Sequence, residues 1–494
     1  MDTSVVIVGG GPVGLMVACE LGLAGVRTTV LERAVRRPEQ SRAWGLHPRT
    51  VETLDRRGLL DGMLHERALW PKLPLAGLWP LLDLKAMDSD HPYLVNVPQT
   101  RIEDMLEERA HSLGVTVLRS HEMRDVEQDA EGVTVTADGP SGELRLRAAY
   151  VVGCDGARST VRRAAGIDFV GTSATVASLL CDCTVVDMGA ERRGMTRTDR
   201  GTVNINLRPT GTARIVTTEF DTTHEDRDAP VTFDEFRATI RHILGRDVDI
   251  ADPVWLARFG DATRQAERYR EGRVLLAGDA AHIHFPYGGL GLNLGLQDAV
   301  NLGWKLAGVV QGRAMDDLLD TYQRERHPVA EWVLDYSRAQ LALLRPGRDV
   351  TALRSLVAGM LEEQGVNKYL AELVTGVAIR YDLADEGVEV PEVVGTLLGD
   401  LTVKDGDGDT SLTRALHSGR AVLVDLTSGA GAARAAEPWA DRVRILSGAG
   451  DTAAGAEVLL VRPDGYVAWA GSAAAAEDPG PAGLPQALRR WFGN

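Results

Sequence analysis

The chain has 494 residues, of which 44% are hydrophobic and 25% charged, so it is long enough for about three ordinary globular domains. Asp and Glu outnumber Lys and Arg by 70 to 54, and the formal charge of −16 disfavours binding to nucleic acid or to an anionic membrane. Four cysteines are too few for a disulfide framework in a chain of this length, which excludes a small disulfide-stapled scaffold.

The N-terminus lacks the pattern of a secretion signal. No basic stretch precedes the first apolar run, which begins at Val5. No apolar run reaches the ~18 residues that a membrane-spanning helix needs. We therefore expect a cytoplasmic protein with no membrane partner.

The first residues predict a β-α-β unit. An apolar run at 5–8 predicts a buried parallel strand, 13–23 predicts a helix, and 27–31 predicts a second strand. Segment 69–98 is rich in Pro, Leu and Trp and predicts loops and short strands near a pocket. Further elements are predicted as helices at 49–60 and 101–113 and strands at 115–118, 123–128, 132–137 and 150–153.

The pattern changes at about residue 174. From there to 259, apolar and polar residues alternate as in an antiparallel sheet, for example at Val203, Ile205 and Leu207. The remaining elements are predicted as a buried strand at 273–277, helices at 294–309 and 318–363, and short strands at 421–426, 457–461 and 466–469. The residues after Pro391 therefore predict a separate small α/β domain.

Residues 9–14 read Gly-Gly-Gly-Pro-Val-Gly and fit GxGxxG between the first strand and helix. Gly9 permits a tight turn, Gly11 lets backbone approach a pyrophosphate, and Gly14 lets helix and strand pack closely. The helix N-terminus offers N–H groups and a positive dipole end to phosphates. Glu32, 18 residues beyond Gly14, can accept hydrogen bonds from a ribose, which favours FAD or NAD over NADP. The alternative is a Gly-rich turn followed by a solvated Glu.

Two further motifs place a carboxylate directly after an apolar strand. Residues 153–159 read Gly-Cys-Asp-Gly-Ala-Arg-Ser, and 275–282 read Leu-Leu-Ala-Gly-Asp-Ala-Ala-His. Ligands bind at the carboxyl edge of a parallel sheet, where Asp279 could accept a hydrogen bond from a ribityl or ribose hydroxyl. Taken alone, either segment could be a turn closed by its own Asp.

Two residue pairs could suggest other chemistry. His282 and His284 invite a metal interpretation, but no third ligand cluster accompanies them, and we predict no metal. Cys181 and Cys183 would lie on one face of a strand, and we predict two buried thiols rather than a redox pair.

In order and spacing, the three motifs resemble the flavoprotein aromatic hydroxylases of the p-hydroxybenzoate hydroxylase class, over roughly residues 1–345. The resemblance implies that the segment around Asp155 serves both FAD and NADPH and that Asp279 holds the FAD ribose. It identifies no catalytic acid or base. The residues expected to hold FAD without a covalent bond are Gly9, Gly11, Pro12, Gly14, Glu32, Arg33, Arg42, Gln99, Met123, Asp155, Asp279, Pro286, Gly289, Gly291, Leu292 and Asn293.

Two stretches, 288–305 and 460–469, resemble most the polyketide hydroxylases that tailor anthracyclines and angucyclines. In those enzymes the tail is a thioredoxin-like domain without redox cysteines, and the tail of this chain contains no cysteine. The family usually has Gln where this chain has Leu290, so the polar contact made at that position is in question.

The expected fold is α/β. A Rossmann-like FAD-binding domain is predicted in two parts, 1–175 and 265–345, separated by an inserted antiparallel β-sheet substrate domain at 176–264. A helical connector at 346–394 leads to the thioredoxin-like domain at 395–494.

The resemblance implies an FAD-dependent, NAD(P)H-consuming monooxygenase of antibiotic biosynthesis. NADPH would visit the flavin transiently, since only one GxGxxG followed by an acid is present, and O₂ would give a flavin 4a-hydroperoxide. One oxygen atom would then enter a polycyclic aromatic polyketide. Two alternatives stay open: Baeyer–Villiger or epoxidising oxygenation, and a flavin-binding module without turnover. The substrate, the choice between NADPH and NADH, and a monomeric or dimeric state are also open.

Overall fold

The central layer is a six-stranded sheet built from segments far apart in the chain, with strand order β19-β20-β11-β1-β2-β7. Five strands run parallel: β1 (Val5–Val8), β2 (Thr28–Glu32), β7 (Thr116–Arg119), β11 (Tyr150–Gly153) and β20 (Val274–Leu276). The edge strand β19 (Arg270–Glu271) is antiparallel. The computed structural model describes all residues except 1, 65–68, 188–193, 209–210, 225, 227, 385–388, 406–407, 428, 430, 451–454, 479 and 481.

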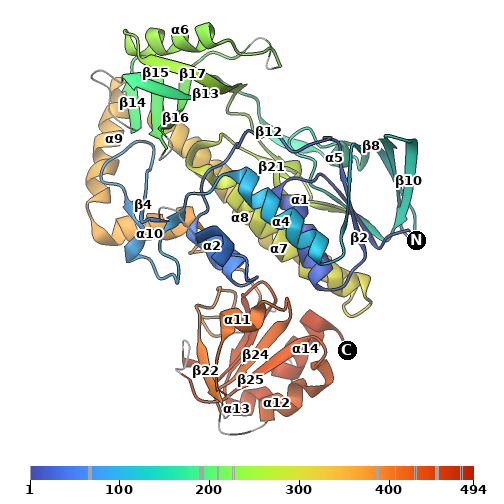
Figure 1. Cartoon of the computed structure of the whole chain (residues 1–494). Coiled ribbons are helices and arrows are strands. Elements are labelled where there is room, and N and C mark those ends of the chain that lie inside the picture. Colours follow the sequence, from blue (N-terminus) through green and yellow to red (C-terminus); the bar gives the residue numbers. More distant parts are fainter. Residues whose placement is uncertain are drawn as a thin grey trace.

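Long helices cover this sheet, as its wholly apolar central strands β1 and β20 require. All four residues of β1 are buried. Helix α1 (Pro12–Leu23) packs between α4 (Gln99–Ser112) and α7 (Leu290–Val310). A Cβ at Gly303 of α7 would lie 2.3 Å from the Cβ of Glu20, so the glycine allows α1 and α7 to approach closely. Figure 1 shows these helices side by side at the centre of the molecule.

A five-stranded antiparallel sheet, of strand order β14-β15-β16-β13-β17, lies at one end of the molecule (Figure 1, upper left). Helix α6 (Phe233–Leu244), which the sequence analysis did not predict, covers one face through Phe236, Ile240 and Ile243. The strands are β13 (Val176–Asp187), β14 (Gly194–Thr198), β15 (Gly201–Leu207), β16 (Thr212–Phe220) and β17 (Asp249–Phe259).

Two predicted helices are shorter than expected. The stretch 49–60 is helical only as α2 (Pro48–Asp55), because the chain turns at Gly58 with a φ of 65° before α3 (Asp61–Leu64). The stretch 318–363 is interrupted after Arg345 by Pro346 and by Gly347, whose φ is 115°. It forms η4 (Asp316–Leu319), α8 (Asp320–Leu344) and α9 (Arg348–Leu361), followed by α10 (Gln364–Thr375).

Short elements complete the region before residue 284. They are β3 (Leu69–Trp70), β4 (Lys72–Leu73), β5 (Leu82–Asp83), η1 (Leu84–Ala86), β6 (Leu94–Val95), β8 (Glu122–Gln128), β9 (Val133–Gly139), β10 (Gly142–Ala148), α5 (Thr160–Ala164), β12 (Phe169–Thr172), β18 (Thr263–Ala266), η2 (Gly278–Ala280) and β21 (His282–Ile283). Strand β10, which pairs with β9, was not predicted. Leu144 and Leu146 alternate with Glu143, Arg145 and Arg147, so this strand could have been predicted from its period of two.

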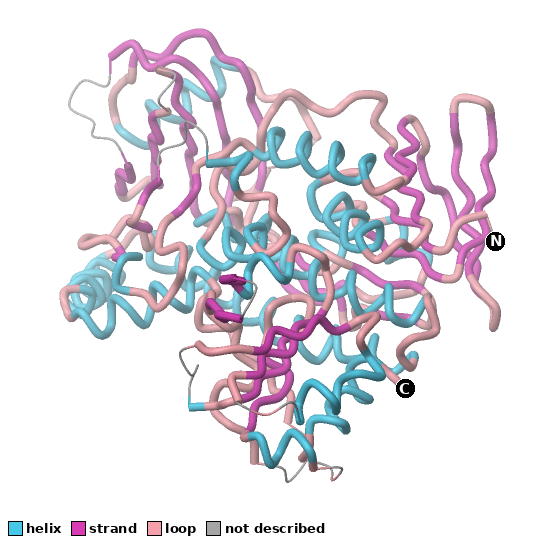
Figure 2. The backbone as a smooth tube through the Cα atoms, turned by 60° about the horizontal axis from the view of Figure 1, so that its bottom comes forward, coloured by secondary structure: helices cyan, strands magenta, loops and turns pink. Residues whose placement is uncertain are grey.

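Residues from about 400 onwards form a separate layer (Figures 1 and 2, bottom). Its four-stranded sheet has the order β25-β24-β26-β27, in which β24 is parallel to β25 and antiparallel to β26. The elements are β22 (Thr402–Asp405), β23 (Gly408–Ser411), α11 (Leu412–Leu416), β24 (Ala421–Asp425), α12 (Gly431–Ala436), η5 (Glu437–Trp439), β25 (Val443–Ser447), β26 (Val458–Val461), β27 (Val467–Gly471), α13 (Ala473–Glu477) and α14 (Leu484–Phe492). Within the described part of the chain, no helix has the length and apolar character needed to cross a membrane.

The positions of Cys181 and Cys183 lead to a first prediction. Both lie on the face of β13 that packs under α6, and both are 0% exposed. We expect a thiol reagent to leave them unmodified in the native protein and to label both after denaturation. Mass spectrometry of a Cys19→Ala/Cys154→Ala variant, in which they are the remaining thiols, measures this directly. Rapid labelling of the native variant would contradict the interpretation as buried thiols.

Candidate functional site

The three sequence motifs meet at the carboxyl edge of the parallel sheet. Strand β1 lies beside β11, and β11 beside β20, so the loops that follow these strands are neighbours. A Cβ at Gly9 would lie 2.3 Å from the carbonyl oxygen of Cys154, and one at Gly278 would lie 2.9 Å from Cγ2 of Val13. These contacts tie the first motif to the second and to the third.

The start of α1 is open to a ligand. Its N-cap, Gly11, makes no side-chain cap, and the first turn, which begins at Pro12, contains no acidic residue. A Cβ at Gly11 would meet nothing within 4 Å, whereas one at Gly14 would lie 2.0 Å from the carbonyl oxygen of Gly9. Gly14 thus serves packing, and the space beside Gly11 leaves the N–H groups of the first turn available to a phosphate.

Glu32 ends β2 and faces the same loop. Its carboxylate accepts hydrogen bonds from the backbone N–H groups of Gly10 and Ala34, each at 2.7 Å. Each oxygen keeps a second lone pair, so the carboxylate can fix the Gly-rich loop and still accept a hydroxyl hydrogen bond. Arg33 follows it and is exposed.

Two carboxylates of the other motifs differ in what they contact. Asp155 Oδ2 accepts hydrogen bonds from the N–H groups of Thr160 (2.6 Å) and Val161 (3.2 Å) and so caps α5. Its Oδ1 is buried, with no hydrogen-bond partner among the described residues. Asp279 lies exposed in η2, and its Oδ1 would be 4.0 Å from a Cβ at Gly291 in the first turn of α7. The site therefore offers one orphaned and one exposed carboxylate oxygen.

The loop before α7 is held by Asn293 and His47. The Asn293 amide accepts the backbone N–H of His47 (2.8 Å) and donates to the carbonyls of Gly45 (3.1 Å) and Gly289 (2.8 Å). His47 Nε2 donates to the carbonyl of Gly288 at 2.9 Å. The Asn293 side chain thus organises the loop and is fully used in doing so. Of the other predicted residues here, Pro286 is exposed, and Leu292 lies in the first turn of α7 near buried Leu290.

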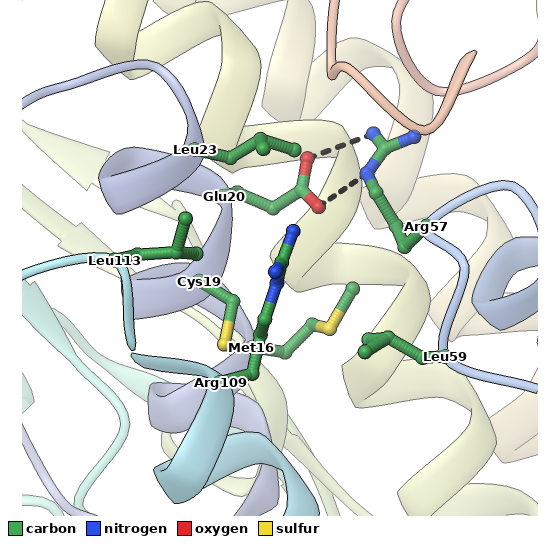
Figure 3. Close-up of a pocket in the computed structure, with 8 residues that line it drawn as sticks. All are labelled: Met16, Cys19, Glu20, Leu23, Arg57, Leu59, Arg109 and Leu113. Carbon is green, nitrogen blue, oxygen red and sulfur yellow. Dashed lines mark hydrogen bonds and ion pairs between the residues drawn. The ribbon is translucent and has the colours of Figure 1, made fainter. Parts of the chain in front are cut away.

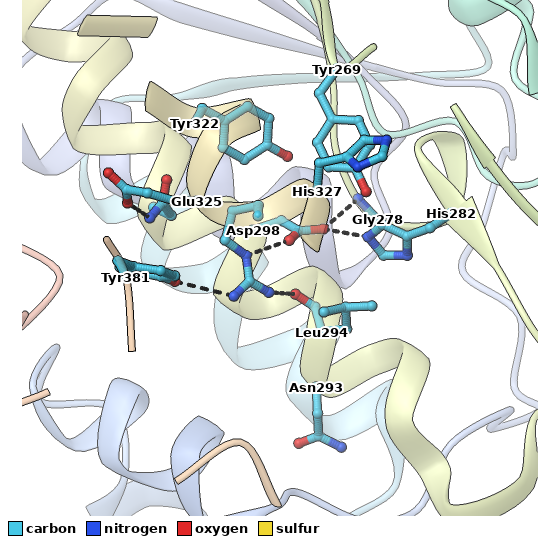
Figure 4. A network of polar contacts seen from close by, with 12 residues as sticks. Tyr269, Gly278, His282, Asn293, Leu294, Asp298, Tyr322, Glu325, His327 and Tyr381 are labelled. Atoms are coloured by element: carbon cyan, nitrogen blue, oxygen red, sulfur yellow. Dashed lines mark hydrogen bonds and ion pairs between the residues drawn. The ribbon is translucent and has the colours of Figure 1, made fainter. Parts of the chain in front are cut away.

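A buried network of ion pairs and hydrogen bonds holds the Gly278–Asp279 turn (Figure 4). Asp298 of α7 accepts hydrogen bonds from His282 Nε2 (2.6 Å), from Arg326 Nε (2.8 Å) and from the backbone N–H of Gly278 (3.3 Å). Burial raises the pKa of Asp298, but Arg326 and His282 more than offset this and lower it below its usual value. His282 is therefore engaged with a carboxylate. Among the described residues, no group of three His, Cys, Asp or Glu could hold a metal.

A side chain of the antiparallel sheet forms hydrogen bonds with the loop that carries Arg42. Arg214 donates to the carbonyls of Ser41 and of Arg42, the latter at 2.7 Å. Asp182 holds Arg214 at 2.8 Å and also Arg208 at 2.9 Å. The Arg208 guanidinium lies 4.1 Å from the centre of the Trp44 ring, which adds a cation–π contact. The side chain of Arg42 itself is exposed.

Gln99 and Met123 complete the predicted set. Gln99 begins α4, where its N–H donates to Ser41 Oγ at 2.7 Å and its Nε2 donates to Glu103 at 2.8 Å. Met123 is buried in β8, opposite Ala137. The 41–44 loop therefore lies between the start of α4 and the antiparallel sheet.

The residues that support the site from a distance were not predicted from the sequence. Asp298, Arg326, Asp182 and Arg214 lie on separate elements and share no local motif. One available signal was a pair of charges in a mainly apolar helix: α7 contains Asp298 and Lys305 among residues such as Leu294 and Leu296. A charge at such a position needs a buried partner.

Comparison with known families agrees with this geometry. An FAD-binding domain model matches residues 2–337, and the model of the aromatic-ring hydroxylase C-terminal region matches residues 391–494. The chain therefore belongs to the FAD-dependent aromatic-ring hydroxylases.

Relatives match along the whole chain. The 12-dehydrotetracycline 5-monooxygenase/anhydrotetracycline 6-monooxygenase of Streptomyces rimosus is 43% identical over 510 residues, covering 100% of this chain and 99% of that protein. The solved structure of an anhydrotetracycline hydroxylase from Streptomyces rimosus superimposes with a TM-score of 0.93 at 41% identity, covering 100% of both chains. A dialkyldecalin synthase of Streptomyces rugosporus is 41% identical over 501 residues, covering 100% of this chain and 99% of that protein.

His47 gives a pH prediction. Burial lowers its pKa to about 4, although hydrogen bonds with the backbone of Gly288 and Val374 act to raise it. Because an unfolded histidine titrates near 6.5, the unfolded state binds an extra proton between pH 6.5 and 4, so the native state loses stability as pH falls through this window. We expect this group to remove about 2 kcal/mol between pH 7 and pH 5.

Urea unfolding at the two pH values measures this loss in the wild type and in His47→Gln, in which it should be absent. His111→Gln, which changes an exposed histidine of α4, is the control and should retain the full loss. Equal pH dependence in all three proteins would show that His47 does not remain neutral on folding.

Proposed function

We propose that this enzyme is an FAD-dependent, NADPH-consuming monooxygenase that inserts one oxygen atom of O₂ into a polycyclic aromatic polyketide in antibiotic biosynthesis. The observation that carries the proposal is the meeting of three loops at one sheet edge, together with an antiparallel sheet that contributes Phe220 and Phe259 to an aromatic cluster.

The residues present fit FAD on their own chemistry. The uncapped start of α1 and the open space at Gly11 suit a pyrophosphate, and Glu32 suits a ribose. The orphaned Oδ1 of Asp155 and the exposed Asp279 can accept hydrogen bonds from sugar or ribityl hydroxyls. When bound, FAD supplies the redox and oxygen chemistry, and the protein supplies binding, orientation and exclusion of water.

An aromatic cluster joins the two sides of the proposed substrate site. Phe259 of β17 lies 5.7 Å from Phe285, ring centre to ring centre, and Phe285 stacks parallel to Tyr287 at 6.0 Å. Phe220 of β16 packs on the same cluster. Phe285 is itself buried, so the partly exposed rings of Phe220, Phe259 and Tyr287 are the ones proposed to contact a flat, apolar substrate through offset or edge contacts.

The polar residues near this aromatic cluster hold the loops around the proposed site in place. Asp182 and its two arginines fix the 41–44 loop, and Asn293 with His47 fixes the loop before α7. The exposed Arg42 lies in the first of these loops, and the turn of the exposed Asp279 is held by Asp298, so both residues start from defined places. No side chain is proposed as a catalytic acid or base.

NADPH is proposed to bind transiently. The sequence has a single GxGxxG with a following acid, and the loops at this edge suit one dinucleotide.

We propose the same division of the chain that the sequence predicts: residues 1–175 and 265–345 bind FAD, residues 176–264 bind substrate, and residues 346–394 form a connector. For 395–494, a thioredoxin-like fold is supported by the parallel β24–β25 pair followed by the antiparallel β26–β27 hairpin and helix α14.

A second candidate is a flavin-dependent fold that closes rings without transferring oxygen. The similarity to the dialkyldecalin synthase favours it, because that protein matches over the same length. Consumption of NADPH that rises on addition of substrate would separate the two functions.

Asp279 gives a direct test of the cofactor site. We expect Asp279→Ala to weaken FAD binding about tenfold or more, since an ionised acceptor of a buried hydroxyl contributes roughly 1.5–3 kcal/mol. Fluorescence titration of the apoprotein with FAD measures the Kd. The control is Asp335→Ala, which removes an exposed carboxylate of α8 that pairs with Arg338. An unchanged Kd in Asp279→Ala would count against the ribose role.

The reaction is tested with ¹⁸O₂ and a panel of polycyclic phenols and quinones. We expect slow NADPH oxidation alone, faster oxidation with a substrate, and one labelled atom in the product with the other in water. Insertion between two ring carbons would indicate Baeyer–Villiger chemistry, and an oxirane would indicate epoxidation. A product that carries oxygen from water, or that forms without NADPH, would overturn the proposal.

A further inference from the structure

A turn of the C-terminal layer is inserted into the FAD-binding part of the chain. Arg462, at the start of this turn, is 0% exposed and forms two parallel hydrogen bonds with Glu325 of α8, at 2.8 and 2.7 Å. Asp464 also accepts from Arg462, at 3.1 Å, and from Trp304 Nε1 of α7, at 3.2 Å. The turn therefore contacts both long helices beneath the candidate FAD site.

A second arginine fixes the turn from the opposite side. Arg57 donates to both carboxylate oxygens of Glu20 in α1, at 2.6 and 2.8 Å (Figure 3). The same guanidinium donates to the carbonyl of Pro463 at 2.9 Å. A Cβ at Gly465 would lie 2.9 Å from the side chain of Arg56, so only glycine fits where the turn meets α2. Helices α7 and α8, together with Arg56 and Arg57 after α2, thus hold residues 462–465 in one place.

The contact continues from Glu325 to the Gly278–Asp279 turn. Arg326, the next residue of α8, binds Asp298 and also donates to the carbonyl of Leu294 at 3.1 Å (Figure 4). Asp298 in turn accepts the N–H of Gly278. Tyr381 makes a parallel link: its hydroxyl accepts from Arg326 at 3.1 Å, and its ring lies 4.3 Å from that of Tyr466.

Glu325 depends on Arg462 electrostatically. Asn301 (2.6 Å) and Lys305 (2.9 Å) also contact its carboxylate. Burial raises the pKa of Glu325, but Arg462 and Lys305 outweigh it and lower the pKa to about 2. Without Arg462, the buried carboxylate would retain only Lys305 as its close cation, and burial lowers the pKa of that amine to about 7. An uncompensated buried charge forces its surroundings to rearrange or the group to take up a proton.

We propose that Arg462 is a positioning residue for FAD. By holding Glu325, it fixes the α8 position from which Arg326 holds Asp298, and Asp298 holds the Gly278–Asp279 turn. The C-terminal layer thereby sets the affinity of a cofactor that it does not touch. This inference rests on the proposed contact of Asp279 with FAD.

The test compares Arg462→Met with Arg420→Met in the full-length chain. Arg420 is a matched control, because it bonds the carbonyls of Ala440 and Val443 within the C-terminal layer. FAD titration of each apoprotein, well below its measured Tm, should show at least tenfold weaker binding in Arg462→Met and less than twofold change in Arg420→Met. Arg462→Lys, which keeps the charge but loses the two-point contact, should fall between them.

Hydrogen–deuterium exchange supplies a readout that general destabilisation would not produce. In the Arg462 variants, amides of residues 276–283 should exchange faster, while those of β13 and β16 stay unchanged. If Arg462→Met does not fold, Glu325→Gln provides the same measurements from the other partner and should also weaken FAD binding. FAD affinity and exchange equal to wild type in Arg462→Met, or in Glu325→Gln where it replaces that variant, would overturn the inference. A wild-type protein that binds no FAD would instead refute the proposed function.

Discussion

Close backbone approach at the carboxyl edge of the parallel sheet is the constraint on which the rest of the structure depends. Only 2.0 Å separates the carbonyl oxygen of Gly9 from the position of a Cβ at Gly14, so α1 can begin directly over β1 only without that side chain. The same lack of side chains at Gly9 and Gly278 brings the other two loops against this helix start. Helices α7 and α8 and the antiparallel sheet are arranged around the start of α1, where the three loops meet. The close backbone contacts fix that place.

Local patterns predicted this edge well, since each motif is a few residues long. The glycines at 9–14, the acid at Glu32 and the alternation of Val203 and Ile205 each express a constraint between near neighbours. Helix α6 could also have been found, because Thr232 caps the N–H of Glu235 in the Thr-x-x-Glu pattern that starts many helices. The helix breaks at Gly58 and Gly347 could likewise have been predicted, because a glycine stands at each break.

The supporting charges could not be predicted in the same way. Asp298 and Arg326 are 28 residues apart and Glu325 and Arg462 are 137 apart, and their pairing depends on tertiary packing. The antiparallel sheet holds the 41–44 loop through Asp182, while the C-terminal layer supports the Gly278–Asp279 turn through Glu325. One proposed dinucleotide site is therefore stabilised from two directions by ionic contacts. Asp298 and Arg462 lie in stretches that the sequence analysis had singled out, but nothing local in those stretches shows which residue each one pairs with.

The strand order also affects how the molecule assembles during synthesis on the ribosome. Strands β1, β2, β7 and β11 are made first, but the partner of β11, strand β20, emerges only after the whole antiparallel sheet has been made. Until then β11 has an open edge, which a nascent chain must protect from pairing with other chains. The guanidinium that neutralises Glu325 emerges later still, in the last part of the chain. Until residue 462 has been made, Lys305 is the one cation among the described residues that pairs with the buried Glu325 carboxylate, so the full set of ion pairs around Glu325 forms last.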